Sequence, residues 1–287
     1  MSLIQKRRCQ GELSFFRNNF ITPHINNSSY FIITIVIYYW KSRKTSNNYL
    51  ENKNFNLKYF IQKQVDFNGK IIGYECLLRQ QHTDGSWSLP EQLDSLPLQR
   101  VVFLLEDTFK SLPTEKIRLS INLEYNQIIS SDFQYFVRWT ISKIEPMQLS
   151  IEYTSAYGPK HVNHYLFESR IKNAKKYGME FSIDNVGSEM KSLKQIEWML
   201  PFVDSIKYSM CNFRKEDPNV WLDLNLQSWN KISKENNIEL ILMGIENKDD
   251  EDLAKLLKIK TRQGYLFGHP ENPKKIRVKN DVQKTKK

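Results

Sequence analysis

The sequence predicts an α/β fold, and a (βα)₈-like barrel fits it best. From Leu57 onward, short strand-like runs alternate with segments of helical periodicity. The strand-like runs are apolar enough to be buried on both faces, as parallel strands usually are. Polar residues recur where these runs end, which is where barrels keep their chemistry. An open, doubly wound sheet is the structural alternative.

The first two strands are expected to form a hairpin. The stretch KYFIQKQVDFNGKIIGYECLLR, residues 58–79, contains two apolar runs joined at Asn68-Gly69. This dipeptide suits the positive φ angles of a tight hairpin turn. The domain is therefore expected to open with two antiparallel strands.

Helices and strands alternate after this hairpin. The first helix is predicted by apolar residues at helical spacing, which are Leu98, Val101, Val102, Leu105, Phe109 and Leu112. Strands are expected at IRLSINL, MQLSIEY, MEFSIDN, VDSIKY, IELILMG and RQGYLFG. Further helices are expected at 133–144, at 161–177, before Leu200, before Asn236 and at 249–257.

Six polar residues stand at or just past the carboxyl ends of predicted strands: Glu75, Asn122, Glu152, Asp184, Lys207 and Glu246. Each alone could end a strand or cap a helix, but six in register favour a shared site on one barrel face. An unpaired buried carboxylate at Glu75 would be costly, so a cation should meet it there. Carboxylates and an amide around one point are hard oxygen ligands, which suit Mg²⁺ or Mn²⁺ rather than zinc.

The net charge of +10 lies at the two ends of the chain. Residues 1–56 contribute +6 and residues 271–287 contribute +5, which leaves the body close to neutral. Solvated tails explain this pattern better than a polyanion-binding surface, so no nucleic-acid partner is expected. The three cysteines are odd in number and far apart, which suits a reducing cytoplasm and forms no zinc pattern.

The apolar segment Tyr30–Trp40 has three open interpretations. As a helix its eleven residues would reach about 16 Å, short of the roughly 30 Å of a bilayer's hydrocarbon core. It could be a membrane-surface or re-entrant anchor, a strand packed on the main domain, or an extension outside the fold. We expect an N-terminal extension with a linker over residues 1–56, a barrel domain over 57–273 and a basic disordered tail over 274–287.

Seven short motifs follow one another along residues 57–273. They are Glu75-Cys76-Leu77-Leu78-Arg79, Ser120–Leu123, Glu152–Ser155, Asp184–Gly187, Val203–Lys207, Met243–Glu246 and Gln263–Phe267. In order and spacing this set resembles the EAL-domain cyclic di-GMP phosphodiesterases, whose motifs read Glu-Ala-Leu-Leu-Arg, Ser-Ile-Asn-Leu, Glu-Ile-Thr-Glu, Asp-Asp-Phe-Gly, Val-Asp-x-x-Lys, Glu-Gly-Val-Glu and Gln-Gly-Tyr-Leu-Phe. Each motif alone is weak, but the ordered set is specific.

The resemblance implies a TIM-like barrel whose first strand is antiparallel, and it implies metal chemistry. In active members two divalent ions activate a water that cuts one phosphodiester of cyclic di-GMP, giving linear pGpG. The first-ion ligands would be Glu75, Asn122, Glu152 and Asp184, all of which are present. The second ion would share Asp184 and use two further carboxylates, but those positions hold Asn185 and Met243. One Mg²⁺ or Mn²⁺ site is therefore expected to be intact and the other dismantled.

Other positions depart from the family motifs. Ser155 replaces a Glu that steadies the loop at 187–192, and this loop, which supports homodimers in the family, is itself altered. Ser209 replaces an Asp that contacts guanine in many members.

Four family positions are retained around the expected pocket. The resemblance implies catalytic roles for Lys207 and Glu246, and substrate contacts for Arg79, Gln263 and Glu246. The leading hypothesis is a catalytically impaired domain that acts as a cyclic di-GMP receptor or as a regulator of an unidentified protein partner. The alternative is a metal-dependent phosphodiesterase with residual activity. A cytoplasmic location is expected, with membrane-surface association through residues 30–40 as one interpretation.

Overall fold

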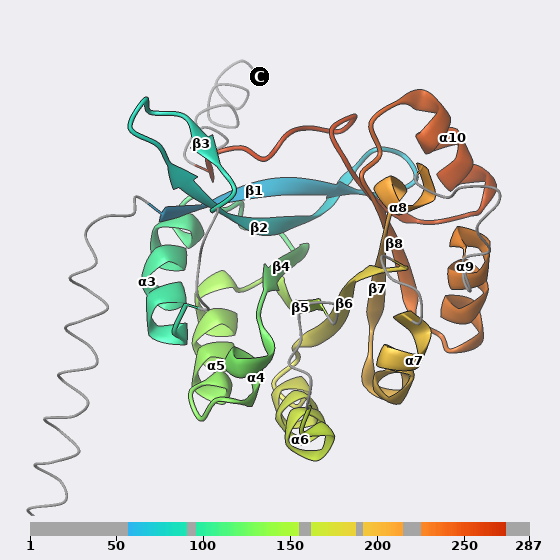
Figure 1. Ribbon diagram of the computed structural model, residues 1–287. Helices are drawn as coiled ribbons and strands as arrows, with labels where there is room; N and C mark the ends of the chain where they lie inside the picture. Colours follow the sequence, from blue (N-terminus) through green and yellow to red (C-terminus); the bar gives the residue numbers. More distant parts are fainter. Residues whose placement is uncertain (1–56, 91–95, 155–161, 188–191, 215–224, 274–287) are drawn as a thin grey trace, which may run out of the picture. The chain divides into compact units, whose positions relative to one another are not determined.

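The computed structural model is a closed barrel with helices around it (Figure 1), and it describes residues 57–90, 96–154, 162–187, 192–214 and 225–273. The strands are β1 (Leu57–Val65), β2 (Ile71–Gln81), β3 (Trp87–Ser88), β4 (Arg118–Asn122), β5 (Gln148–Thr154), β6 (Glu180–Val186), β7 (Ser205–Ser209), β8 (Glu239–Met243) and β9 (Thr261–Gln263). The barrel closes because β1 pairs antiparallel with both β2 and β9, while β2 and β4 to β9 run parallel. This confirms the barrel with an antiparallel first strand and excludes the open sheet.

The helices pack outside the strands. They are α3 (Leu98–Phe109), α4 (Tyr125–Ile129), α5 (Phe133–Ile144), α6 (His164–Lys175), α7 (Ser192–Ile196), a 3₁₀ helix (Glu197–Phe202), α8 (Met210–Arg214), α9 (Leu226–Glu235) and α10 (Lys248–Leu256). The predicted first helix is confirmed, although it ends before Leu112. Helix α6 begins at His164 rather than at 161, because the side chain of Asn163 caps it by accepting the Leu166 N–H.

The β1–β2 turn differs in detail from the predicted one. Of the Asn68-Gly69 pair, only Gly69 takes a positive φ, of 79°. The carboxylate of Asp66 accepts the backbone N–H groups of Asn68 and Lys70, at 2.8 and 2.9 Å. The aspartate therefore organises the turn, and glycine is required at a single position.

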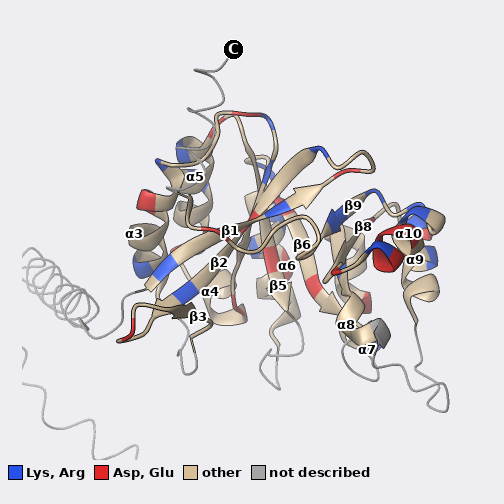
Figure 2. Cartoon of the chain, turned by 90° about the horizontal axis from the view of Figure 1, so that it is seen from above, with Lys and Arg blue, Asp and Glu red and all other residues tan. Residues whose placement is uncertain are grey.

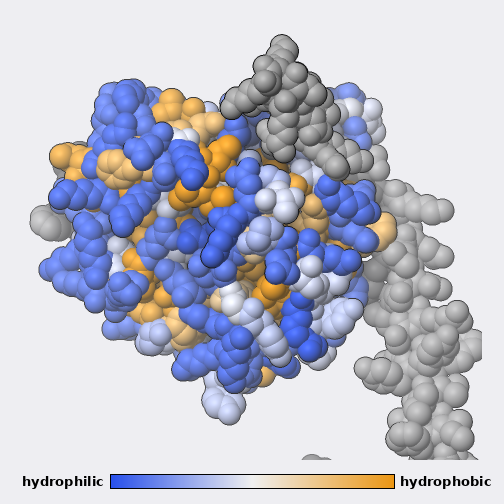
Figure 3. All heavy atoms as spheres, turned by 180° about the vertical axis from the view of Figure 1, so that it is seen from behind, coloured by the Kyte–Doolittle hydropathy of each residue, from blue (hydrophilic) through white to orange (hydrophobic). Residues whose placement is uncertain are grey.

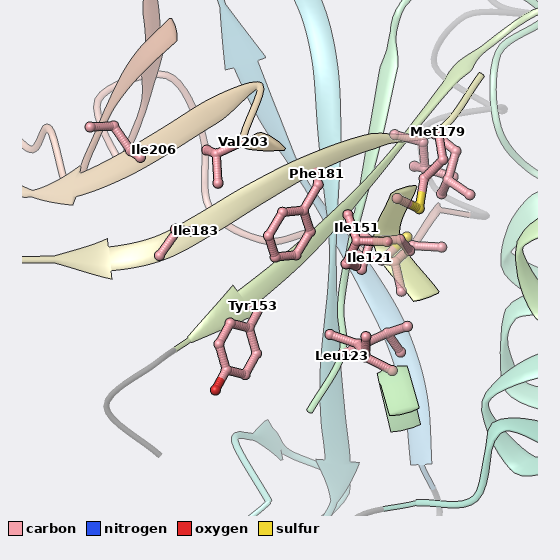
Figure 4. Packing of buried hydrophobic residues seen from close by; sticks show 14 of the residues in the cluster. Ile121, Leu123, Ile151, Tyr153, Met179, Phe181, Ile183, Val203 and Ile206 are labelled. Carbon is pink, nitrogen blue, oxygen red and sulfur yellow. The ribbon is translucent and has the colours of Figure 1, made fainter. Parts of the chain in front are cut away.

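The strands are buried on both faces, and the outer face is the more apolar of the two. On the outer face, Ile121, Ile151, Phe181 and Ile183 lie together in the hydrophobic core between strands and helices (Figure 4). Most of the alternate positions point into the barrel and are polar, with Ile241 of β8 as an apolar exception. The expected burial of the strands on both faces is confirmed, but it does not require both faces to be apolar. A middle layer of this interior contains four buried serines, Ser120, Ser150, Ser182 and Ser205.

Charged residues lie above and below this serine layer, and Figure 2 shows them on the central strands as well as on the outer helices. At the amino end of the strands, Arg118 forms ion pairs with Glu180 at 2.9 Å and Glu239 at 2.6 Å. These three side chains join β4, β6 and β8 across the barrel. The opposite end carries the predicted site.

The face shown in Figure 3 is mainly hydrophilic, with apolar residues scattered over it. Among the described residues, no helix combines the length and the hydropathy needed to cross a membrane. The predicted extension (1–56), its segment Tyr30–Trp40 and the tail (274–287) lie outside the described residues.

Gly264 should tolerate no side chain, because an added Cβ would collide with the backbone of Ile245. We expect Gly264→Ala to lower the free energy of unfolding by roughly 3 kcal/mol or more, measured by urea denaturation. Gly69→Ala is the matched control: it meets open space and should cost only about 1 to 2 kcal/mol, from its positive φ. Equal losses in the two variants would contradict the collision.

Candidate functional site

The ammonium group of Lys207 lies among three carboxylates at the carboxyl ends of the strands. Its Nζ is 2.8 Å from Glu75 Oε2, 2.7 Å from Glu152 Oε2 and 3.8 Å from Asp184 Oδ1. The side chains of Lys207 and Glu152 are fully buried. Four strands contribute these residues, each at an inward-facing position. The cation that meets Glu75 within the protein is therefore Lys207.

Glu75 has hydrogen-bond partners on both carboxylate oxygens. The side-chain amide of Asn122 donates to Oε1 at 2.7 Å, and that of Gln263 donates to Oε2 at 2.6 Å. Burial alone would raise the pKa of Glu75, but the charge of Lys207 and these hydrogen bonds hold it below its usual range. Glu75 is accordingly ionised at neutral pH.

The other two carboxyl groups are less well compensated. Burial and the neighbouring charge of Glu75 raise the pKa of Glu152 to about 8, despite the nearby lysine. Burial also raises the pKa of Asp184, whose Oδ2 accepts a hydrogen bond from Thr154 at 3.4 Å. Burial would lower the pKa of Lys207, but the carboxylates, led by Glu152 and Glu75, raise it. One lysine thus faces three acids, and the cluster is short of positive charge.

Two buried oxygens of this cluster are suited to a further cation. Glu152 Oε1 and Asp184 Oδ1 have no hydrogen-bond partner among the described residues. Unpaired carboxylate oxygens are hard ligands of the kind that Mg²⁺ and Mn²⁺ prefer. Within the described part of the chain, however, no three acidic, histidine or cysteine side chains form a ready metal-binding group. A metal ion must therefore compete with Lys207 for the carboxylates.

The remaining predicted site residues lie around this cluster. Arg79 is half-buried, and it lines a cavity of about 470 Å³ that Asn122 and Thr154 also line. Gln263 is buried and supports Glu75, so it does not lie on an open pocket surface. Glu246 is exposed on the loop after β8, outside the buried cluster.

Most of the positions that depart from the family motifs lie within the described residues. Asn185 has a φ of 56°, which asparagine tolerates, and its Oδ1 accepts a hydrogen bond from Asn212 at 3.3 Å. Met243 is half-buried at the end of β8. Ser209 is buried, and its Oγ accepts the Cys211 backbone N–H at 3.2 Å. Ser155 and the loop residues 188–191 lie outside the described residues.

Sequence reasoning missed two residues of the cluster. Gln62 and Gln64 on β1 are buried and both contact Gln263. Their spacing of two in an otherwise strand-like run was a usable signal, because it places both amides on one face.

A family model described as the EAL domain matches residues 43–270. This chain belongs to the EAL domain family. It is 25% identical over 223 residues to the probable cyclic di-GMP phosphodiesterase PdeB of Escherichia coli strain K12. That match covers 70% of this chain and 40% of PdeB, so the chain spans less than half of that relative's length.

Two solved EAL structures resemble this domain. The Bacillus subtilis YkuI protein, in complex with cyclic di-GMP and calcium, has a TM-score of 0.62 and 16% identity, covering 84% of this chain and 63% of that one. The EAL enzyme Bd1971, in its cAMP- and cyclic-di-GMP-bound form, has a TM-score of 0.67 and 18% identity, covering 97% of this chain and 76% of that one. At these identities the likeness establishes the fold.

Binding of Mn²⁺ to the EAL domain should tighten as pH rises from about 6 to 8 and then level off. Glu152, with its pKa raised to about 8, must lose its proton before it can bind a metal ion. The dissociation constant should fall by up to about tenfold per pH unit over this range, measured by calorimetry. Glu152→Gln should remove the pH dependence, because it has no such proton to lose. If the wild type binds Mn²⁺ with the same affinity across this pH range, Glu152 is not the group that loses its proton on binding.

Proposed function

We propose that this EAL domain binds cyclic di-GMP together with one Mg²⁺ or Mn²⁺ ion and hydrolyses it slowly or not at all, so that it acts as a nucleotide receptor. The observation that carries this proposal is the difference between its two metal positions. The first-ion residues are brought together around Lys207, whereas the second-ion positions hold an amide and a thioether.

The single ion would be held by Glu75, Asn122, Glu152 and Asp184. Glu152 Oε1 and Asp184 Oδ1 support this set, because they are buried acceptors that receive no hydrogen bond among the described residues. When bound, such an ion neutralises phosphate charge and lowers the pKa of a bound water. The calcium and cyclic di-GMP in the YkuI structure support the same combination of ligands.

The nucleotide would occupy the cavity beside Asn122. The cavity combines the half-buried guanidinium of Arg79 with apolar and aromatic walls that include Leu89, Tyr125 and Tyr153. A guanidinium is a forked donor suited to phosphate oxygens, and apolar walls suit the faces of bases. The bound phosphate would then lie between Arg79 and the metal cluster.

Weak turnover follows from the second position. The amide of Asn185 brings no charge, and its oxygen is engaged by Asn212. The thioether of Met243 is a soft ligand that Mg²⁺ disfavours. The retained Lys207 and first-ion residues favour the alternative function, which is a phosphodiesterase with residual activity. Analysis of the reaction products distinguishes this enzyme from a receptor.

A receptor requires an output, so we further propose an unidentified regulatory protein as partner.

Arg79→Met should weaken cyclic di-GMP binding about tenfold or more, because it removes a charge-assisted contact to phosphate. The measurement is calorimetry in the presence of Mg²⁺. Arg138→Met on α5 is the matched control, since Arg138 is exposed and contacts the ring of Tyr177 rather than the cavity. Unchanged affinity in Arg79→Met would remove the cavity from the proposed site.

The wild-type domain, incubated with cyclic di-GMP and Mn²⁺, should form little linear product over hours. Restoring both carboxylates with Asn185→Asp and Met243→Glu should raise turnover at least about tenfold, because a second dication regains charged ligands. Chromatography of the products measures both rates. Rapid product formation by the wild type would overturn the receptor proposal and support the enzyme.

A further inference from the structure

Two glutamines of β1 face the interior of the barrel. Gln62 lies opposite Glu75 of β2, and Gln64 lies opposite both Gly73 of β2 and Gln263 of β9. Gln64 is completely buried. Burying an amide in such a place is costly unless its hydrogen bonds are satisfied.

The amides form a directed chain of hydrogen bonds that ends at Glu75, in the cluster of carboxylates around Lys207. Gln64 Nε2 donates to Gln263 Oε1 at 3.2 Å, and Gln263 Nε2 donates to Glu75 Oε2 at 2.6 Å. The same nitrogen of Gln263 donates to Gln62 Oε1 at 3.0 Å, while Gln62 Nε2 donates to the Gly268 carbonyl at 3.1 Å.

The direction of this chain follows from the charge of Glu75. An ionised carboxylate only accepts hydrogen bonds, so Gln263 must present its NH₂ group to it. The oxygen of Gln263 is then turned toward β1, where it needs a donor. Gln62 does not supply it, because its oxygen faces the Gln263 nitrogen and its own nitrogen donates to the Gly268 carbonyl. Gln64 supplies the N–H.

The space for Gln64 is provided by Gly73. A Cβ at Gly73 would lie 2.8 Å from Gln64 Oε1, so a larger residue there would displace the amide. The same oxygen has no hydrogen-bond partner among the described residues. The hydrogen bond that fixes the orientation of Gln64 is therefore the one from its nitrogen to Gln263.

We propose that Gln64 is a positioning residue: it holds the amide of Gln263 in the orientation that donates to Glu75, and thereby sets the geometry of Glu75 as a metal ligand. The metal-binding half of this inference rests on the proposed function, whereas the orienting half does not. A merely structural role would affect stability without changing the environment of the Gln263 amide.

The orienting half is tested by NMR on the metal-free protein. The side-chain NH₂ signals of Gln263 are assigned by their loss in Gln263→Met. In Gln64→Met, which keeps the chain length and removes the donor, these signals should shift and exchange faster with water. Thr140→Val is the control, because Thr140 is a buried polar residue on α5, outside the barrel interior. Unchanged Gln263 signals in Gln64→Met would overturn the proposal.

The metal-binding half is tested by Mn²⁺ titration of the same variants. Gln263→Met should weaken binding by about ten- to a hundredfold and Gln64→Met by about three- to tenfold, because both act on the outer support of a ligand. The double variant should bind like Gln263→Met alone, since Gln64 acts through Gln263. Multiplying effects, or no effect of Gln64→Met, would overturn this half. Absence of Mn²⁺ binding to the wild type would instead refute the proposed metal site, and the NMR result would still decide the orienting role.

Discussion

The ion cluster around Lys207 is the constraint on which the rest of this domain depends. A lysine and three acids inside a barrel are tolerable only if the charges are paired in good geometry and further hydrogen bonds satisfy them. Lys207 comes from β7, and Glu75, Glu152 and Asp184 come from β2, β5 and β6, so four strands must hold one register. The closed barrel supplies that register, because every strand in it has two neighbours.

Alternate residues of each strand have different roles: the outward-facing residues stabilise the fold, and the inward-facing residues form the candidate site. Four strands carry the pattern Ser-Ile followed by a polar residue, ending in Asn122, Glu152, Asp184 and Lys207. The central isoleucines of β4, β5 and β6 face the helices with the outer hydrophobic core, while the serines and the polar residues face inward. Because burial free energy comes from the outer face, the inner face is free to carry charged groups. One period-two pattern therefore specifies both layers.

Much of this could be predicted from the sequence, and the exceptions have physical causes. The inward-facing polar positions Glu75, Asn122 and Asp184 were evident because polar residues interrupt apolar runs. Only Asn122 ends its strand, however, since β2 continues to Gln81 and β6 to Val186. The polar interior was missed because serine and glutamine are not decisive in a strand pattern, although Gln62 and Gln64 shared a face. Short helices such as α4 have too few residues to show a period. The compensation of Glu75 by Lys207 depends on residues 132 positions apart, which only the closed barrel brings together.

On the proposed function, the charge balance of the cluster is satisfied by one ion. Three carboxylates carry three negative charges when ionised, and Lys207 with one dication would neutralise them. A second dication would then enter a neutral, low-dielectric pocket and would need carboxylates of its own. The family motifs carry an Asp and a Glu for that purpose, where this chain has Asn185 and Met243. On the proposed function, the bound nucleotide brings the next negative charge, so phosphate and a single ion complete the site together.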